Sequence, residues 1–249
     1  MKKFFVVFLI ALVLLGIAAV WDSVYNKVSA EESEPVEVET AAEPVYLEQK
    51  VEVTPPSFMA HTLYVLGDHV NERERPNTDA LVLNYYCAGE VVEVVDKTGD
   101  WYQLSSGGYI REDLLTDDYD AIVPHFLETY QDLIVTHISH GQRTEYWYYG
   151  EMIASGDCVT GDAYKSPTPP GLYWITSRQT DVDQYKDSDD WFCTFNGLIG
   201  YHNAVWRWEF GGEIYKGMGS AGCVNCTNEL AKAIFDHCRV GYTYVLILP

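Results

Sequence analysis

The chain has 249 residues, of which 47% are hydrophobic, and this length and composition are typical of one or two globular domains. The formal net charge is −21, so the protein has no excess of basic residues with which to neutralise phosphates. This balance excludes the common nucleic-acid-binding classes, and we expect no nucleic-acid partner.

The N-terminus carries the pattern of an export signal or a membrane anchor. Two lysines precede an apolar run of 18 residues from Phe4 to Trp21, which is long enough to span a bilayer. Val28-Ser29-Ala30 fits the small-residue rule for signal cleavage but lies well beyond the run, which favours an uncleaved anchor over a cleaved signal. We predict a signal or single-span membrane anchor over residues 1–30. The remainder is expected outside the cytoplasm in the cell envelope, membrane-anchored or secreted to the cell wall.

Residues 31–57 are predicted to form an acidic linker. Seven glutamates stand against one lysine between residues 31 and 50, and four prolines interrupt the segment. Such a segment cannot bury enough apolar surface to fold and is extended by its own charge. The six cysteines of the chain are too few for a disulfide scaffold at this length. One or two bridges are compatible with export, and their pairing does not follow from the sequence.

Short β-like runs separated by turn clusters follow from about residue 60. They comprise Leu63–Val65, Leu81–Leu83, Val91–Val95 and Trp101–Leu104. From residue 119 a short connecting helix over 119–130 is expected, and then further strands over Leu133–Ser139, Glu145–Ile153, Gly171–Thr176 and Tyr242–Leu248. One amphipathic helix is predicted over Thr227–His237, capped by Thr227 or Asn225 and followed by Gly241. The chain is therefore expected to be mainly β.

A cysteine and an upstream histidine form the candidate catalytic pair. Cys223 lies in the run Gly219-Ser220-Ala221-Gly222-Cys223-Val224-Asn225, and His202 precedes it. A thiolate can attack a carbonyl while an imidazole takes up and returns protons, which is the chemistry of acyl transfer through a thioester. The helix expected after Cys223 would favour the thiolate through the positive end of its dipole.

Residues 58–118 resemble a bacterial Src-homology-3-like domain. The resemblance rests on Val70-Asn71-Glu72-Arg73 before a Pro-Asn-Thr turn, Ala88-Gly89-Glu90-Val91-Val92-Glu93-Val94, Gly99-Asp100-Trp101-Tyr102-Gln103-Leu104 and Gly108-Tyr109-Ile110. It implies a small barrel, often appended to cell-wall enzymes as a wall-binding or positioning module. A spacer without a ligand is an equally open interpretation, because fold alone does not imply function.

Residues from about 131 to 249 resemble the YkuD-type L,D-transpeptidase catalytic domain, and we place this domain over residues 119–249. The matching pieces are Val159-Thr160-Gly161, Pro167-Thr168-Pro169-Pro170-Gly171-Leu172-Tyr173-Trp174-Ile175, Ile199-Gly200-Tyr201-His202, Trp206-Arg207, Phe210-Gly211-Gly212, Ile214-Tyr215-Lys216 and Ser220-Ala221-Gly222-Cys223-Val224-Asn225. The resemblance implies a β-sandwich with a short helix after the catalytic cysteine. It also implies a transferase that joins peptidoglycan stem peptides, with no metal and no cofactor.

The resemblance also assigns roles to residues of this chain. Cys223 would be the nucleophile and His202 the general base and acid. Ser220 would help to orient the imidazole or would shape the pocket, and the backbone around Gly222 and Cys223 would form the oxyanion hole. Substrate contacts would come from five further residues, Tyr201, Asn203, Trp206, Tyr215 and Asn225.

Two positions depart from the family pattern. Ala221 stands where the signature has a second histidine, which puts substrate positioning and oxyanion geometry in question. Asn203 follows His202 where related sequences often place an acid, and an asparagine can orient an imidazole but cannot stabilise its cation by charge.

Other functions remain as alternatives to a transpeptidase. Water in place of an acceptor amine would give an L,D-carboxypeptidase, and a site inactivated by Ala221 would leave a wall-binding protein. The spacing Cys223-x-x-Cys226 also fits a redox pair, and with His237-Cys238 downstream a zinc site is a further alternative. Papain-like wall peptidases place the cysteine before the histidine, and the order here is the reverse.

Overall fold

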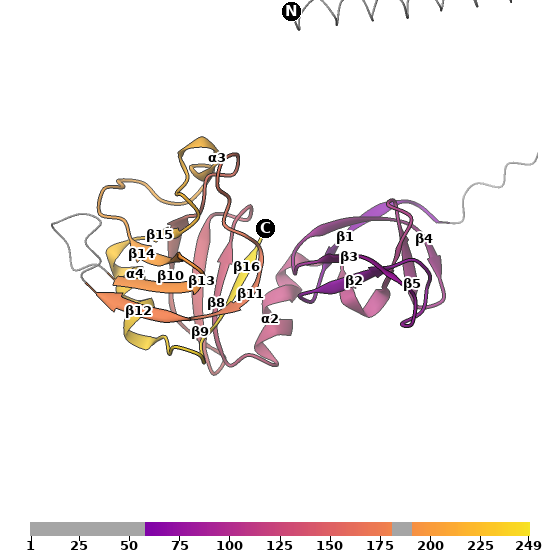
Figure 1. Ribbon diagram of the computed structural model, residues 1–249, viewed down its shortest axis with the longest axis horizontal. Coiled ribbons are helices and arrows are strands. Elements are labelled where there is room, and N and C mark those ends of the chain that lie inside the picture. The colour runs from indigo at the N-terminus through magenta and orange to yellow at the C-terminus, as the bar shows by residue number, and fades with distance from the viewer. Residues whose placement is uncertain (1–57, 181–190) are drawn as a thin grey trace, which may run out of the picture. The chain divides into compact units, whose positions relative to one another are not determined.

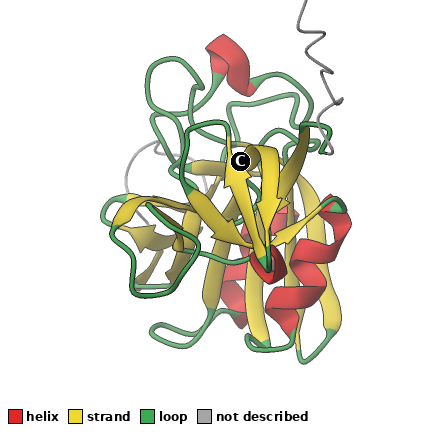
Figure 2. Ribbon diagram, turned by 90° about the vertical axis from the view of Figure 1, so that its right-hand side faces the viewer, coloured by secondary structure: helices red, strands yellow, loops and turns green. Residues whose placement is uncertain are grey.

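The computed structural model describes residues 58–180 and 191–249, all within one compact unit that spans residues 54–249. The predicted anchor over 1–30 and the predicted linker over 31–57 lie outside the described residues. Within the described ranges, no helix is long and apolar enough to cross a membrane. Strands dominate and helices are few, as Figure 2 shows, so the prediction of a mainly β protein is confirmed.

The first half of the described chain forms a seven-stranded sheet with the order β3-β2-β6-β5-β4-β1-β7. Its strands are β1 (His61–Val65), β2 (Val70–Arg73), β3 (Val82–Tyr86), β4 (Val91–Thr98), β5 (Trp101–Leu104), β6 (Tyr109–Arg111) and β7 (Leu115–Thr116). All its pairings are antiparallel. Alternating residues of β1 and β4, including Leu63, Val65, Val92 and Val94, fill its core.

The second half forms a nine-stranded sheet with the order β11-β16-β8-β9-β10-β15-β14-β13-β12 (Figure 1). Its strands are β8 (Asp132–His137), β9 (Arg143–Tyr148), β10 (Glu151–Val159), β11 (Gly171–Trp174), β12 (Ser177–Thr180), β13 (Trp191–Asn196), β14 (Ile199–Asn203), β15 (Val224–Cys226) and β16 (Tyr244–Leu248). Two neighbouring pairs, β8 with β16 and β14 with β15, are parallel, and the others are antiparallel.

Short helices connect and cover the strands. They are η1 (Glu112–Leu114), η2 (Tyr119–Ala121), α2 (Ile122–Leu127), α3 (Tyr215–Met218) and α4 (Asn228–His237). The hydroxyl of Thr227 accepts a hydrogen bond from the Leu230 N–H, so Thr227 is the N-cap of α4, as predicted. The C-cap is Cys238, so Gly241 falls in the following turn rather than at the helix end.

Two cores hold the second half together. One lies between strands β8, β9, β10, β13, β14, β15 and β16 and helix α4, where Tyr146, Tyr201, Val224, Leu230 and Ile234 are buried. The other lies under α2, whose Ile122 and Phe126 pack on Leu133, Val135 and Leu246 of β8 and β16. Because β8 alternates between these cores, all six of its residues are buried.

One predicted strand is divided in the structure. The run over Glu145–Ile153 is broken at Tyr149 and Gly150, which have φ angles of 49° and 81° and form the tight connection between β9 and β10. The sequence signal failed here because Tyr146-Trp147-Tyr148-Tyr149 is uniformly aromatic, and only Gly150 marks the turn.

Candidate active site

The candidate catalytic residues are positioned by two neighbouring parallel strands, β14 and β15. His202 is on β14 and is the register partner of Asn225 on β15, while Cys223 immediately precedes β15. Side chains two residues apart on a strand point to the same face. Cys223 and Asn225 therefore share one face with His202, and Tyr201 and Val224 point to the other, into the core.

Glycine permits the close approach of strands around this pair. A Cβ on Gly200 would lie 2.3 Å from the carbonyl oxygen of Cys193 on β13. A Cβ on Gly219 would lie 2.3 Å from the backbone nitrogen of Asp162, and one on Gly161 would lie 2.1 Å from the carbonyl oxygen of Ser166. Real Cβ contacts of this length do not occur, so any larger side chain would move the backbone of the site.

A second loop supports the turn that carries Cys223. Thr168 Oγ1 accepts a hydrogen bond from the Gly161 N–H at 2.8 Å and donates to the Gly222 carbonyl at 2.7 Å. Ser166 Oγ donates to the Ser220 carbonyl at 3.0 Å, and Gly161 and Ser220 form an isolated parallel bridge. Gly161 and Thr168, which belong to the family-like segments 159–161 and 167–175, thus hold residues 220–222 in place.

Hydrogen bonds fix the tautomer of His202. Its Nδ1 lies 2.8 Å from the carbonyl oxygen of Asn203, which can only accept, so Nδ1 carries the proton. Its Nε2 lies 2.9 Å from the side-chain nitrogen of Asn225, which can only donate. The ring stacks on Trp206 with a centroid distance of 5.8 Å and meets the edge of Phe192. The imidazole therefore presents Nε2 as its unprotonated nitrogen.

Arg207 orients the amide of Asn225. Its Nε donates to Asn225 Oδ1 at 2.8 Å, and its Nη1 donates to the Met218 carbonyl at 3.0 Å. Because Oδ1 faces Arg207, the amide nitrogen of Asn225 must face His202. The resulting chain, which we call the Arg207–Asn225–His202 relay, was missed from the sequence. The family-like Trp206-Arg207 segment was the available signal.

Cys223 lies in a half-buried setting. Its Sγ is 3.6 Å from the Leu198 carbonyl oxygen, and burial raises the pKa of the thiol, while the backbone N–H of Gly200 opposes this rise. The expected help from a helix N-terminus is absent, because β15 and the N-cap Thr227 separate Cys223 from α4. The sequence-based expectation of a thiolate favoured by the helix dipole was therefore wrong.

Ser220 contacts the turn rather than the imidazole. Its hydroxyl donates to the Cys223 carbonyl and accepts from the Gly222 N–H at 3.0 Å. Of the two roles predicted for Ser220, these hydrogen bonds favour the shaping of the pocket, through the loop that carries the nucleophile. Because the Gly222 N–H already has a partner in Ser220, it is not available in this state as the oxyanion donor that the sequence suggested.

Two of the predicted substrate-contacting residues are buried elsewhere. Tyr201 is 1% exposed in the core, and its hydroxyl lies 2.8 Å from Thr136 Oγ1. The side chain of Asn203 accepts from the Trp191 N–H at 3.2 Å and donates to Asn228 Oδ1 at 3.1 Å, so it joins β13 to α4. Asn203 orients His202 through its backbone carbonyl instead of its side chain.

The other predicted substrate residues lie near the pair in different ways. Trp206 is 41% exposed and stacks on His202, so its indole lies at the surface beside the candidate base. Tyr215 of α3 is buried, and its carbonyl accepts from the Ala163 N–H at 3.0 Å, which suits a structural contact. Asn225 is buried within the relay.

Neither the redox pair nor the zinc site finds support. Cys226 is fully buried on β15 and belongs to the core, on the face opposite Cys223. Two thiols on opposite faces of a strand cannot resolve one another without unfolding it. Among the described residues, no group of three or more His, Cys, Asp or Glu side chains is placed to hold a metal ion.

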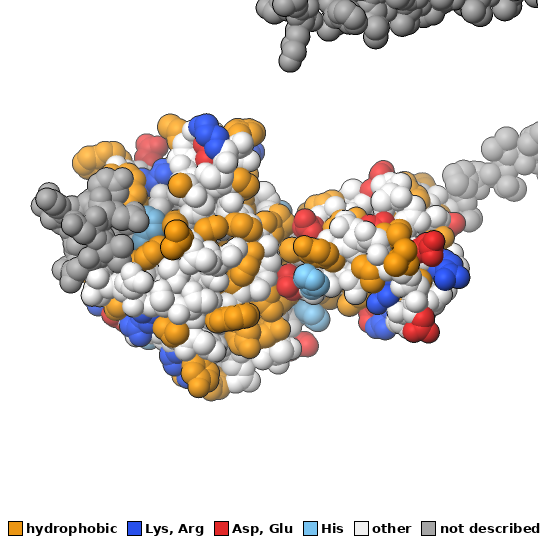
Figure 3. All heavy atoms as spheres, viewed as in Figure 1, with side chains coloured by type: hydrophobic (Ala, Val, Ile, Leu, Met, Phe, Trp, Pro, Cys, Tyr) orange, Lys and Arg blue, Asp and Glu red, His pale blue; other side chains and the backbone are white. Residues whose placement is uncertain are grey.

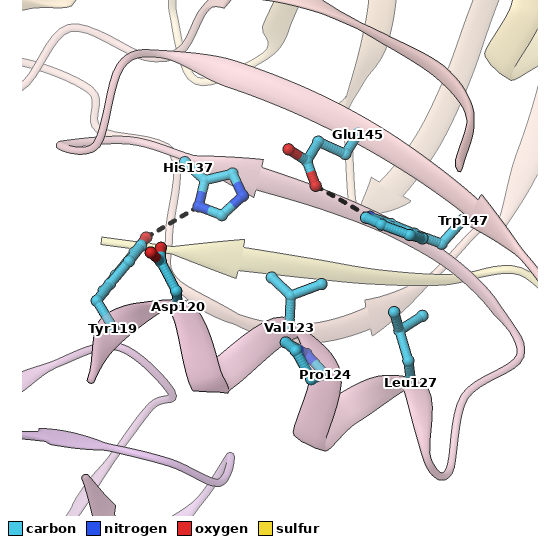
Figure 4. Close-up of a pocket in the computed structure, with 8 residues that line it drawn as sticks. All are labelled: Tyr119, Asp120, Val123, Pro124, Leu127, His137, Glu145 and Trp147. Atoms are coloured by element: carbon cyan, nitrogen blue, oxygen red, sulfur yellow. Dashed lines mark hydrogen bonds between the residues drawn. The ribbon is translucent and has the colours of Figure 1, made fainter. Parts of the chain in front are cut away.

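A separate hollow of about 250 Å³ lies between α2 and strands β8 and β9 (Figure 4). Tyr119 Oη is 3.0 Å from His137 Nδ1, and Glu145 accepts from the Trp147 indole N–H at 3.0 Å. Burial lowers the pKa of His137. The remaining lining residues are Asp120, Val123, Pro124 and Leu127. The polar groups of this hollow are largely paired with one another, and its lining contains neither His202 nor Cys223.

Apolar side chains are also exposed on the surface (Figure 3). They include Leu198 and Trp206 from the loops around the candidate pair and Met218 at the end of α3, together with Trp208, which is 95% exposed. Exposed aromatic and aliphatic groups beside a nucleophile are typical of a ligand-binding surface.

Comparisons with known proteins give two family matches. Residues 131–247 match the L,D-transpeptidase catalytic domain family YkuD, and residues 67–117 match the bacterial SH3 domain family. No curated protein sequence matches the chain.

Solved structures similar to the chain include several L,D-transpeptidases. The catalytic domain of the E. faecium L,D-transpeptidase, solved by NMR, is 25% identical with a TM-score of 0.41, over 47% of this chain and 96% of that one. An L,D-transpeptidase from Stackebrandtia nassauensis is 22% identical with a TM-score of 0.38, over 49% of this chain and 57% of that one. An L,D-transpeptidase from Mycobacterium tuberculosis H37Rv is 15% identical with a TM-score of 0.38, over 68% of this chain and 71% of that one.

The family assignment rests on the sequence matches and on the segments that they contain. The match over 131–247 includes β14, β15 and the loops that hold His202, Arg207 and Cys223. The match over 67–117 lies within the seven-stranded sheet. The chain therefore carries an L,D-transpeptidase catalytic domain of the YkuD family, preceded by a bacterial SH3 domain.

Proposed function

We propose that this protein is a peptidoglycan L,D-transpeptidase that forms 3→3 cross-links from a tetrapeptide donor stem through a thioester on Cys223. The observation that carries the proposal is the family match over 131–247, within which His202 lies on β14 and Cys223 immediately precedes β15, the parallel neighbour of β14. Thiol, imidazole and backbone donors suffice for acyl transfer, so the reaction needs no metal or cofactor.

In the first half-reaction, Cys223 Sγ attacks the carbonyl of the third stem residue. The bond between that carbon and the nitrogen of the terminal D-Ala breaks, and D-Ala leaves as the free amine. His202 Nε2, the unprotonated nitrogen, takes the thiol proton and passes it to the departing amine. Nε2 gives up its hydrogen bond from Asn225 as it does so.

A base is required because burial raises the pKa of the Cys223 thiol. The Asn203 carbonyl accepts from Nδ1–H of His202 and so stabilises the imidazolium that forms. The Gly200 N–H, directed at the sulfur, stabilises the thiolate. We assign the oxyanion donor to the N–H of Cys223, because the Gly222 N–H is held by Ser220.

In the second half-reaction, the side-chain amine of a neighbouring stem attacks the thioester. The new amide forms, and the thiol is regenerated with the proton that His202 removes from the amine. The exposed indole of Trp206, stacked on His202, is placed to contact the stem peptide. Water as acceptor would yield an L,D-carboxypeptidase.

We further propose that the seven-stranded sheet is an SH3-like barrel that contacts the cell wall and that the enzyme acts outside the cytoplasm. The family match over 67–117 supports the first of these, and the apolar N-terminal run supports the second. The same run would anchor the chain to the membrane.

The test is to incubate the full chain with disaccharide-tetrapeptide and to identify the products by mass spectrometry. A dimer that lacks one D-Ala is expected, and Cys223→Ala should abolish it. A tripeptide monomer alone would identify a carboxypeptidase. No product from folded protein would contradict the enzymatic proposal and favour an inactive wall-binding protein.

A further inference from the structure

A buried pair of cysteines lies behind the candidate site and takes no part in it. Cys193 on β13 and Cys238 at the end of α4 are 45 positions apart, and their sulfur atoms are 3.5 Å apart. Both side chains are buried in the core that also contains Tyr201 and Val224. All six cysteines are free thiols in this structure.

We propose that Cys193 and Cys238 are a disulfide-forming pair, which a disulfide oxidant links in a thiol–disulfide exchange as the chain folds. The two sulfurs are already 3.5 Å apart, so they need to approach by only about 1.5 Å to reach the disulfide bond length of about 2.05 Å. The proposal is independent of whether Cys223 is catalytic.

Hydrogen bonds on both sides of Cys238 hold its backbone in place opposite Cys193. Arg239 Nε and Nη2 donate to Asp132 Oδ2 at 3.0 and 2.7 Å, and the Arg239 N–H donates to Thr243 Oγ1 at 2.8 Å. On the other side, the Cys238 N–H donates to the Ile234 carbonyl at 2.9 Å. Cys193 is fixed by its ladder with Tyr201 of β14 and Arg178 of β12.

The chemistry proceeds in two exchanges. The pKa of Cys238 is lowered because Cys193 donates its S–H to it and because the charge of Arg178 lies near, so Cys238 ionises first. Its thiolate attacks the oxidant disulfide and expels one thiol, which leaves a mixed disulfide on Cys238. The sulfur of Cys193 then attacks this bond and expels the second thiol. Two electrons and two protons pass from the cysteine pair to the oxidant.

The disulfide would close a loop that contains the candidate active site. Its loop would enclose residues 194–237, which contain His202, Arg207, Ser220, Cys223 and Asn225. Closing a loop of this length restricts the unfolded chain and stabilises the native one. The bond would thus secure β13 and α4 around the site while leaving the Cys223 thiol available.

Two other buried cysteines form the pair with which Cys193 and Cys238 can be compared. Cys158 on β10 and Cys226 on β15 are also fully buried and are directly opposite in register, so they are the competing pair. Only the Cys193 and Cys238 sulfurs are in contact among the cysteines of the described residues. The structure therefore predicts one specific pairing out of the fifteen single bonds that six cysteines allow.

The experiment refolds the full chain in a buffer of reduced and oxidised glutathione, blocks free thiols with N-ethylmaleimide and maps non-reduced peptides by mass spectrometry. One bond is expected, joining the peptides of Cys193 and Cys238, with four blocked thiols. Six blocked thiols, or a bond between any other two cysteines, would overturn the proposal. This measurement needs no variant, so it does not depend on a variant's ability to fold.

A stability measurement accompanies the mapping. Oxidised wild type should have a Tm about 10 °C above the dithiothreitol-reduced form. Cys158→Ala, a matched change at an equally buried position, should keep this difference, and Cys193→Ala should lose it. An equal Tm for the two redox forms of wild type, or a difference that survives in Cys193→Ala, would overturn the proposal.

Discussion

Replacing Arg207 by leucine is expected to slow acylation of Cys223, because the relay would lose the group that sets the Asn225 amide. Without Arg207 Nε, the buried Oδ1 of Asn225 loses its donor at 2.8 Å, and the amide can rotate away from His202 Nε2. An unsatisfied buried acceptor costs about 1–3 kcal/mol. If about 2 kcal/mol of this falls on the transition state, the rate decreases roughly 30-fold.

The assay is the rate at which a carbapenem adds to Cys223, followed by intact-mass spectrometry, since the family resemblance implies that such compounds acylate this cysteine. Arg207→Lys should show an intermediate rate, because a lysine cannot donate both to Asn225 and to the Met218 carbonyl in the geometry of a guanidinium. Imidazole ¹⁵N spectra of His202 should shift toward a mixture of tautomers in Arg207→Leu. A structural change alone would not produce that signature.

Arg143→Leu is the matched control, because Arg143 lies on β9 and donates to Ser155, outside the relay. Its acylation rate and tautomer spectrum should equal those of wild type. An unchanged rate and an unchanged His202 spectrum in folded Arg207→Leu would refute the relay.

Three further predictions follow from distances and pKa shifts. Gly219→Ala should lower the acylation rate about 10-fold or more and lower the Tm, because the new Cβ would lie 2.3 Å from the Asp162 backbone nitrogen. The control Gly156→Ala, whose Cβ would have its nearest contact at 3.5 Å, should be tolerated. Equal losses in the two variants would contradict this reasoning. Burial raises the pKa of Cys223, so its alkylation by iodoacetamide in the absence of substrate should accelerate continuously up to about pH 9, and a plateau below about pH 8 would argue against it. Burial lowers the pKa of His137, so the unfolded chain takes up a proton that the native one does not. The free energy of unfolding should then fall as the pH decreases below about 6.5, less so in His137→Gln, and identical denaturant titrations of the two proteins across this range would contradict the assignment.

Local signals in the sequence predicted the strands and the helix at the end of the chain. Thr227 before an apolar stripe located the start of α4 to within one residue, and the structure selects Thr227 over Asn225 as its N-cap. The order of family-like segments placed His202 and Cys223 near one another, and the structure brings their strands into a parallel pair.

The predictions that were wrong concern which face of a strand is buried and where a short strand lies. Tyr201 and His202 are adjacent, and nothing in the local pattern says which of them points into the core, so Tyr201 was wrongly assigned to substrate. The three-residue strand β15 between Cys223 and α4 is too short to show periodicity, which is why the thiol was expected at the helix end.

The relay could not be predicted because it is made across the fold. Arg207 and Asn225 are 18 positions apart, and they meet only when the loop after β14 folds back on β15. Similarly, the contact between Cys193 and Cys238 depends on α4 packing on β13.

The central claim is that Cys223 forms a thioester with the donor stem, and the most direct measurement is the intact mass of the full chain mixed rapidly with disaccharide-tetrapeptide. A transient adduct equal to the donor minus D-Ala is expected, located on the peptide that contains Cys223. The adduct should be absent in Cys223→Ala and strongly reduced in His202→Ala. Product formation with no such adduct, or an adduct on another cysteine, would contradict it.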